Sequence, residues 1–140
     1  MIRAKHSSLS ATVERQALRR RVKQMHTWFN RGCWEKCFSL IDPLIREKGR
    51  VESSTYAEQL QEFRKAYGAI HLWYVRITLY LDGSVNKRDP RPFAYVYVVW
   101  KDNAHRFHMF QERWVRDGDH WYTRVVGLVV NRREFADDQD

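Results

Sequence analysis

The segment from Phe93 to Val130 constrains the fold more than any other part of this 140-residue chain. It contains the sequence Arg116-Asp117-Gly118-Asp119 between two runs that are rich in hydrophobic and aromatic residues. An Asp-Gly pair in this setting indicates a β-hairpin, because a type I′ turn requires positive φ angles at its two central residues. A second, weaker turn is predicted at Lys101-Asp102-Asn103-Ala104. The segment is therefore expected to form three antiparallel strands.

Two-residue loops at both turns would fix the pairing of these strands. Arg116 would then lie opposite Asp119, and Val99 opposite Arg106. Because side chains alternate along a strand with a period of two, one face of the sheet is expected to combine large aromatic side chains with a few hydrogen-bonding groups. These residues are Tyr95, Tyr97, His108, Phe110, Glu112, Trp114, Trp121 and Thr123.

The opposite face of the predicted sheet is mostly apolar. Its residues are Val96, Val98, Trp100, Phe107, Met109, Val126 and Leu128. Soluble monomers seldom leave such a patch uncovered, and the predicted helices have enough apolar surface for one face only. We therefore expect a second copy to cover this face in a two-fold homodimer. Exchanging the inner and outer faces would move the interface without removing the need for a partner.

Three helices are predicted before the sheet. The first, from about Ser10 to Asn30, is indicated by an apolar stripe at helical spacing that consists of Leu18, Val22, Met25 and Phe29. The second is expected to begin near Cys33 and to be kinked or restarted at Asp42-Pro43, since Asp is a good N-cap and Pro suits the first helical position. The third is expected to run to Gly68 from Thr55, which with Glu58 fits a capping box.

A strand and a loop are predicted between the third helix and Phe93. The strand, Ile70 to Leu81, would place five apolar side chains on one side, namely Trp73, Val75, Ile77, Leu79 and Leu81. The connection 82–92 contains Gly, Pro and several basic residues, which are typical of a long exposed loop. Residues 1–9 and 131–140 are expected to fray. Residues 1–140 are therefore predicted to form a single domain.

Three helices followed by four antiparallel strands, ending in the Trp-containing hairpin from Glu112 to Trp121, resemble the nuclear transport factor 2-like superfamily. The resemblance covers nearly the whole chain in element order, and the hairpin is its most specific part. It implies an α+β fold in which three N-terminal helices pack on a strongly bent antiparallel sheet of about four long strands, a cystatin-like cone around a pocket. Many members dimerise through the sheet. Ketosteroid isomerase and polyketide cyclases share this fold with non-catalytic domains, so the fold does not select a function.

Glu112 and His108 are the residues best suited to acid/base chemistry. A carboxylate among aromatic side chains would have a raised pKa, and a neighbouring histidine could share its proton. Alternatively, Glu112 could pair with Arg106, and His108 could bond a tyrosine hydroxyl.

The sequence thus supports two hypotheses. The first is a non-catalytic module whose pocket binds an unknown ligand that is small and hydrophobic or aromatic. The second is a lyase, isomerase or hydrolase that uses Glu112 and His108. The expected ligand contacts are Tyr95, Tyr97, Arg106, Phe110, Trp114, Trp121 and Thr123.

The formal net charge of +8 raises a third hypothesis, a nucleic-acid partner. Basic residues are spread along the chain without a recognised binding signature, so this partner is not the one expected. No metal or other cofactor is predicted, because His105 and His108 would point to opposite faces of a strand, and Cys33 and Cys37 have no second ligand pair nearby. No signal peptide or apolar membrane span is recognised, so a cytoplasmic location is expected.

Overall fold

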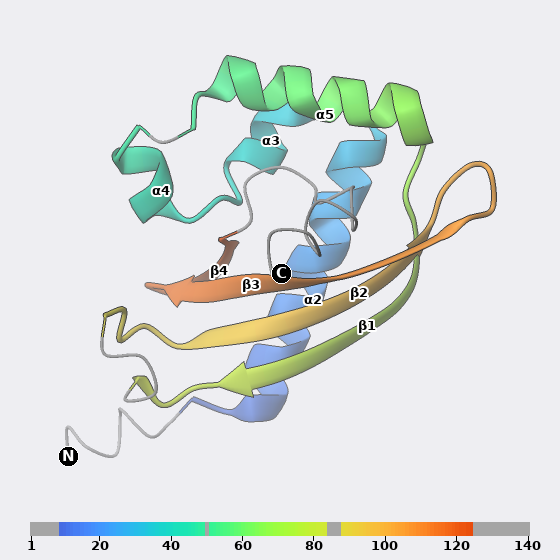
Figure 1. Cartoon of the computed structure of the whole chain (residues 1–140). Coiled ribbons are helices and arrows are strands. Elements are labelled where there is room, and N and C mark those ends of the chain that lie inside the picture. Colours follow the sequence, from blue (N-terminus) through green and yellow to red (C-terminus); the bar gives the residue numbers. More distant parts are fainter. Residues whose placement is uncertain (1–8, 50, 84–87, 125–140) are drawn as a thin grey trace, which may run out of the picture.

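The computed structural model describes residues 9–49, 51–83 and 88–124. Within these residues the order of elements is α2 (Ala11–Asn30), α3 (Trp34–Phe38), α4 (Pro43–Glu47), α5 (Ser53–Tyr67), β1 (His71–Tyr80), β2 (Phe93–Lys101), β3 (Phe107–Asp117) and β4 (His120–Thr123) (Figure 1). The strands form one antiparallel sheet in the order β1-β2-β3-β4. The predicted α+β class is confirmed, but four helices replace the predicted three in the described part of the chain.

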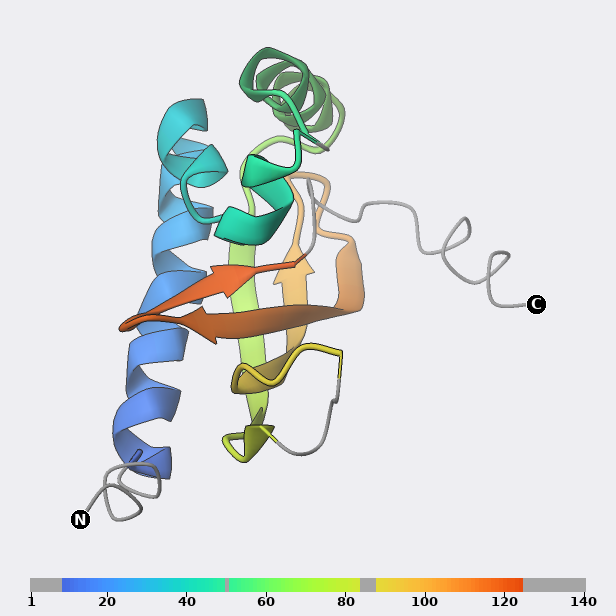
Figure 2. The same ribbon diagram turned by 90° about the vertical axis from the view of Figure 1, so that its left-hand side faces the viewer.

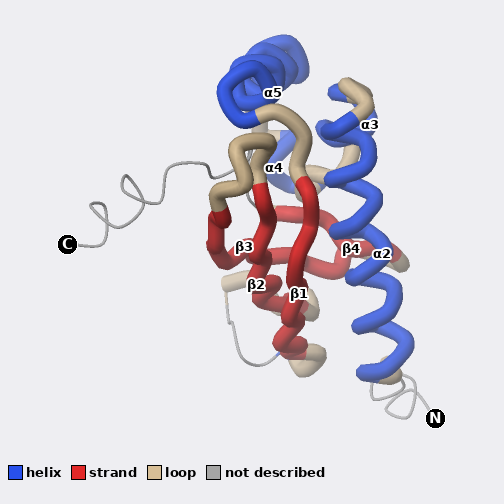
Figure 3. Tube along the Cα trace, turned by 90° about the vertical axis from the view of Figure 1, so that its right-hand side faces the viewer, coloured by secondary structure: helices blue, strands red, loops and turns tan. Residues whose placement is uncertain are grey.

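α2 agrees with its predicted boundaries. The hydroxyl of Ser10 accepts a hydrogen bond from the backbone amide of Val13 (3.3 Å), which satisfies one of the amides left without a partner at a helix N-terminus. The predicted stripe of Leu18, Val22, Met25 and Phe29 is buried. The helix lies along one face of the sheet (Figure 3), and its buried stripe places the apolar side toward the core.

The predicted second helix is divided into α3 and α4 because the chain meets the sheet between them. Ile41 forms a parallel bridge with Thr123, and the amide of Asp42 donates to the carbonyl of Thr123 (2.9 Å). The carboxylate of Asp42 then accepts a hydrogen bond from the amide of Leu44 (3.1 Å), with Pro43 in the first turn of α4. The helix is thus restarted at Asp42-Pro43, one of the two outcomes expected.

α5 begins three residues earlier than predicted. Its N-cap is Glu52, whose side chain makes no capping hydrogen bond, so the predicted start and capping box at Thr55 are wrong. The predicted end at Gly68 is confirmed by its positive φ of 77°. The helix crosses over one end of the sheet and buries Tyr56, Leu60 and Phe63 (Figure 1).

The core lies between the helices and one face of the sheet. β2 contributes Ala94, Val96, Val98 and Trp100, all fully buried. The rings of Phe63 and Trp100 lie 5.6 Å apart, which places α5 directly against this face. β3 turns along its length, so that its last residues and β4 run across the direction of β1 and β2 (Figure 2). We call the face toward the helices the inner face and the opposite one the outer face.

The pairing of β2 with β3 differs from the prediction by three residues. The connecting turn spans Asp102–Arg106 instead of two residues, and Tyr97 pairs with Gln111 instead of His108. An odd shift reverses which side chains share a face. Tyr95 and Tyr97 therefore lie on the outer face, away from the rest of the predicted pocket residues.

The same shift corrects the predicted dimer surface. Val96, Val98 and Trp100 are buried in the core and cannot form an exposed interface, whereas Phe107 and Met109 are exposed on the outer face. The other two predicted interface residues, Val126 and Leu128, lie outside the described residues, as do 1–8 and 131–140 of the segments predicted to fray.

The hairpin between β3 and β4 is shifted by two residues from the predicted pairing. Asp117 pairs with His120 across a loop that contains Gly118, whose φ is 62°. An even shift preserves the faces. Trp114, Trp121 and Thr123 therefore stay on the predicted face, together with Glu112.

β1 contains an irregularity that the alternating pattern does not predict. The pairing with β2 changes register between Leu72 and Tyr74, so Trp73 has no paired residue. Trp73 is 67% exposed. The prediction that it shares a face with Val75 and Ile77 is therefore wrong. An extra residue of this kind re-aims one side chain.

Candidate functional site

Glu112 and His108 share the inner face of β3 but contact different groups. The carboxylate of Glu112 is 3% exposed and accepts a hydrogen bond from the indole nitrogen of Trp114 (3.0 Å). The Nε2 of His108 lies 2.9 Å from the carboxylate of Asp102, and its ring stacks on Trp100 with centroids 4.2 Å apart. The structure does not bring the predicted acid/base pair together.

Asp102 organises the turn between β2 and β3. Its buried carboxylate accepts hydrogen bonds from the amides of Ala104 (2.8 Å) and Arg106 (3.0 Å) and from the Nε of Arg106 (3.0 Å). Burial raises the pKa of Asp102, but the bonds from His108, Arg106 and Ala104 outweigh burial and hold it well below its usual range. Arg106 therefore pairs with Asp102, not with Glu112, and both His108 and Arg106 belong to a cluster that stabilises the turn.

Glu112 is buried, and its charge acts on the hydroxyl of Tyr56 in α5. Burial raises the pKa of Glu112 to about 7, and the bond from Trp114 lowers it only in part. The hydroxyl of Tyr56 is also buried and has no hydrogen-bond partner among the described residues. Its pKa is raised, mainly by burial, with further contributions from Cys37 and Glu112. A carboxyl with this pKa can exchange a proton near neutrality, but solvent does not reach it.

The remaining predicted ligand contacts are divided between the core and the outer face. Phe110, Trp114, Trp121 and Thr123 are buried, whereas Tyr95 and Tyr97 lie on the other side of the sheet. The indole nitrogen of Trp121 donates to Glu14 (2.9 Å), which also accepts a hydrogen bond from the Nε of Arg116 (2.9 Å). Trp121 thus connects β4 to α2.

The outer face carries exposed apolar side chains, with Trp73 and Phe107 the most exposed at 67% and 52%. Tyr74 and Met109 are exposed beside them. The rings of Trp73 and Phe107 meet edge to face at 5.4 Å. Cations lie over the rings of this face: Lys101 over Trp73 and Phe107, Arg76 over Tyr97, and Arg113 over Phe93. The result is an aromatic surface that carries positive charge.

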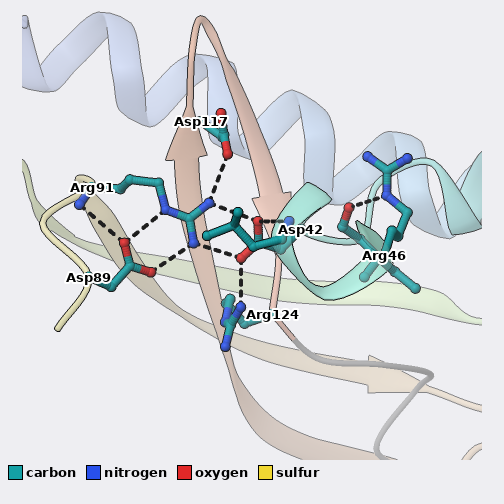
Figure 4. Close-up of polar contacts among 8 residues, drawn as sticks. Asp42, Arg46, Asp89, Arg91, Asp117 and Arg124 are labelled. Carbon is teal, nitrogen blue, oxygen red and sulfur yellow. Dashed lines mark hydrogen bonds and ion pairs between the residues drawn. The ribbon is translucent and has the colours of Figure 1, made fainter. Parts of the chain in front are cut away.

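A third feature is an ion cluster centred on Arg91 (Figure 4). Two guanidinium nitrogens of Arg91 each lie 2.8 Å from an oxygen of Asp42. Arg91 also contacts both oxygens of Asp89 (2.7 and 2.8 Å) and one of Asp117 (2.9 Å), while Arg124 contacts Asp42 at 2.7 Å. Three carboxylates and two arginines are thereby held in one network.

The cluster joins four parts of the chain and fixes α4. Burial raises the pKa of Asp42, but the hydrogen bonds from Arg91 and Arg124 outweigh burial and lower it to about 2. The side chain of Arg91 is only 16% exposed, although the sequence predicts an exposed loop at 82–92. Asp42 was recognised as a helix cap, but no local signal connects it with Arg91.

Within the described ranges, no helix is both long and apolar enough to cross a membrane. Among the same residues, no group of three or more His, Cys, Asp or Glu side chains could hold a metal ion. Comparison of the chain with protein-family models, with curated proteins and with solved structures found no match.

Proposed function

We propose that this protein is a non-catalytic binding or interaction module of the nuclear transport factor 2-like type, and that it works as a homodimer. Two features support the relationship. Helices precede a four-stranded antiparallel sheet and cover its inner face. The turn along β3 is consistent with the bent sheet of a cone (Figure 2).

The exposed aromatic surface of the outer face is the observation that carries the proposal of a homodimer. The inner face is already filled by the helices, so Trp73, Tyr74, Phe107 and Met109 have no cover from the described chain. Clustered exposed apolar residues of this size mark an interaction surface.

A second copy suits this surface because the contacts within it can also form across a two-fold axis. The face combines ring-on-ring contacts with cations that lie over rings. Both contacts are favourable between copies as well as within one, and an isologous interface pairs a patch with itself. The interface therefore contains Phe107 and Met109 from the original prediction, and Trp73 and Tyr74 in place of Val96, Val98 and Trp100.

No contact in the described part of the chain favours the enzyme hypothesis. Glu112 and His108 have separate partners, and the carboxyl of Glu112 is closed to solvent. A nucleic-acid partner would use the same outer face, because stacked bases need exposed rings and phosphates need cations. The test below separates this alternative from the homodimer.

The test is sedimentation equilibrium of the wild type and of two lysine variants at micromolar concentration. Phe107→Lys places a charge on the outer face, and Val13→Lys is its matched control, because Val13 is 56% exposed on α2. We expect dimers for the wild type and Val13→Lys, and a dissociation constant at least about tenfold higher for Phe107→Lys, since an unpaired charge is costly to bury.

Two results would contradict the proposal. A wild type that sediments as a 17.0 kDa monomer rejects the homodimer, and equal dimerisation of all three proteins rejects the outer face as its interface. If the monomer instead binds single-stranded oligonucleotides, with an affinity that falls steeply with salt, the outer face belongs to nucleic acid.

A further inference from the structure

A cleft of about 450 Å³ lies beside the ion cluster centred on Arg91. Its walls come from α4, from residues 88–91 before β2, and from Arg113 and Arg124. This volume lies within the range of sites for small molecules, roughly 300 to 1,000 Å³. None of the predicted pocket residues contributes to it, so the cleft was not predicted.

Positive charge dominates the lining of the cleft. Its cations are Lys48, Arg88, Arg91, Arg113 and Arg124, and its carboxylate is Asp89. Asp42 and Asp117 contact Arg91 as well. Arg91 and Arg124 are paired with these three carboxylates, so the cations of the lining outside the ion cluster are Lys48, Arg88 and Arg113.

The cations differ in how they are held. Arg91 and Arg124 are fixed by their ion pairs with Asp42, Asp89 and Asp117, so they form a rigid wall whose charges are already paired. Arg113 lies over the ring of Phe93 at 4.5 Å, and its guanidinium makes no ion pair with any described residue. Lys48 makes no ion pair with any described residue. Arg113 and Lys48 therefore have donors available to an anion, and stacking has already ordered the guanidinium of Arg113.

Apolar groups complete the cleft. Leu44 is exposed on α4, and Pro90 contributes a second apolar surface on the other wall. A ligand with both an anionic group and a carbon skeleton would match both parts of this lining.

We propose that this cleft binds a small organic phosphate, with its dianionic phosphoryl group at Arg113 and Lys48 and its carbon skeleton against Leu44. Lys48 and Arg113 make no ion pair with any described residue, and the planar guanidinium of Arg113 presents paired donors to phosphate oxygens. The inference rests on the proposed role as a ligand-binding module and names the chemistry of the ligand. It does not depend on the homodimer, which is measured separately by sedimentation.

Isothermal titration calorimetry with three probes tests the ligand class. Phenyl phosphate has the dianion and an apolar ring, inorganic phosphate lacks the ring, and benzoate has the ring with a single charge. We expect phenyl phosphate to bind most tightly and benzoate at least about tenfold more weakly, as expected from the loss of a charge-assisted hydrogen bond. Equal or tighter binding of benzoate would overturn the phosphate assignment, and so would the absence of binding by phenyl phosphate at millimolar concentration.

Two substitutions test the site itself. Arg113→Met and Lys48→Met each remove a cation and keep a chain of similar length, and each is expected to weaken phenyl phosphate about tenfold. Arg31→Met and Lys65→Met, exposed positions outside the cleft, are the matched controls and should bind as the wild type does. Unchanged affinity in both cleft variants would overturn the site. Lys48 is exposed, so Lys48→Met still tests the site if Arg113→Met fails to fold. Sedimentation of the wild type tests the homodimer separately.

Discussion

Glu112 couples the stability of the core to pH. In the unfolded chain its carboxyl loses a proton near pH 4.5, and in the folded protein near pH 7, because burial disfavours the charged form. Between these values the folded state holds a proton that the unfolded state has lost. The free energy of unfolding therefore falls as pH rises through this window, by up to about 3 kcal/mol.

Glu112→Gln should remove that loss of stability. The amide cannot ionise, and its oxygen can still accept the hydrogen bond from Trp114. We expect the variant to be more stable than the wild type at pH 8 by up to about 3 kcal/mol, with little difference at pH 4. Urea unfolding at the two pH values measures both. A difference that is the same at both pH values would show that ionisation of Glu112 is not the cause.

His26 acts in the opposite direction. It is buried in α2, neither ring nitrogen has a partner among the described residues, and burial lowers its pKa from 6.5 to about 4. The unfolded state takes up a proton at a higher pH than the folded state does. Stability is therefore lost as pH falls from about 6.5 to 4, by up to about 3 kcal/mol.

His26→Leu should abolish this sensitivity to acid. Between pH 6.5 and 4.5 the effects of His26 and Glu112 oppose each other, so the wild type is expected to vary little there. His26→Leu should gain stability on acidification across this range, and Glu112→Gln should lose it. Chemical unfolding of both variants at pH 6.5 and 4.5 provides the comparison, and slopes of the same sign would contradict this account.

At the scale of the elements, helices and strands could be predicted from periodicity, whereas their pairing depended on turns. The stripe of α2 is local and was found correctly. The sequence predicts a two-residue turn at Asp102, but the carboxylate of Asp102 accepts hydrogen bonds from the amides of Ala104 and Arg106 and so stabilises a longer turn. The longer turn shifts the pairing of β2 with β3 by three residues, which places Tyr95 and Tyr97 on the outer face. Trp73 was misplaced because nothing in the alternation marks a bulge.

Gly68 joins α5 to the sheet in a conformation that other residues rarely adopt. Its φ and ψ are 77° and −153°, and an added Cβ would collide with the side-chain amide of Asn103. The backbone amide of Asn103 donates a hydrogen bond to the carbonyl of Tyr67 (3.2 Å), so the turn between β2 and β3 contacts the end of α5.

Gly68→Ala is expected to lower the free energy of unfolding by about 2 to 3 kcal/mol, from backbone strain and displacement of Asn103. Gly49→Ala is the control, because Gly49 also has positive φ (65°) but no atom near the added methyl group. It should cost about 1 kcal/mol. Thermal or urea unfolding of both proteins measures the difference, and equal losses would mean that the contact with Asn103 contributes nothing.

For the whole molecule, net charge sets how self-association responds to salt. Each copy carries a formal charge of +8, and Arg76, Lys101 and Arg113 lie on the outer face itself. Salt screens repulsion between like charges. Raising the salt concentration should therefore tighten the proposed homodimer, whereas it would weaken binding to a nucleic acid. Sedimentation at low and high salt gives the sign, and a dimer that dissociates in high salt would contradict an apolar interface.

The α+β class could be predicted for the molecule as a whole, but the cleft could not. Its lining comes from α4, residues 88–91, Arg113 and Arg124, which are distant in sequence and carry no shared motif. Such a site depends on tertiary pairing and on ion pairs between distant residues. Propensity and periodicity contain no information about either.

The ion cluster centred on Arg91 also bears on the order of events in folding. Asp42 precedes Arg91 by 49 residues and Arg124 by 82, so closing these loops carries a large entropic cost. Local elements such as α2 and the β3-β4 hairpin can form earlier. During synthesis, Asp42 has neither arginine as a partner until the segment with Arg91 has been made, and Arg124 follows later still.

Arg91→Met should consequently raise the unfolding rate and leave the folding rate nearly unchanged, because contacts that form after the transition state act on unfolding. Loss of one partner from a buried ion pair costs about 3 kcal/mol, which corresponds to an increase of about a hundredfold in that rate. Stopped-flow unfolding and refolding measure both, and a slower folding rate would mean that the cluster forms early. On this account, local elements determine how quickly the native protein appears, and Arg91 determines how long it persists.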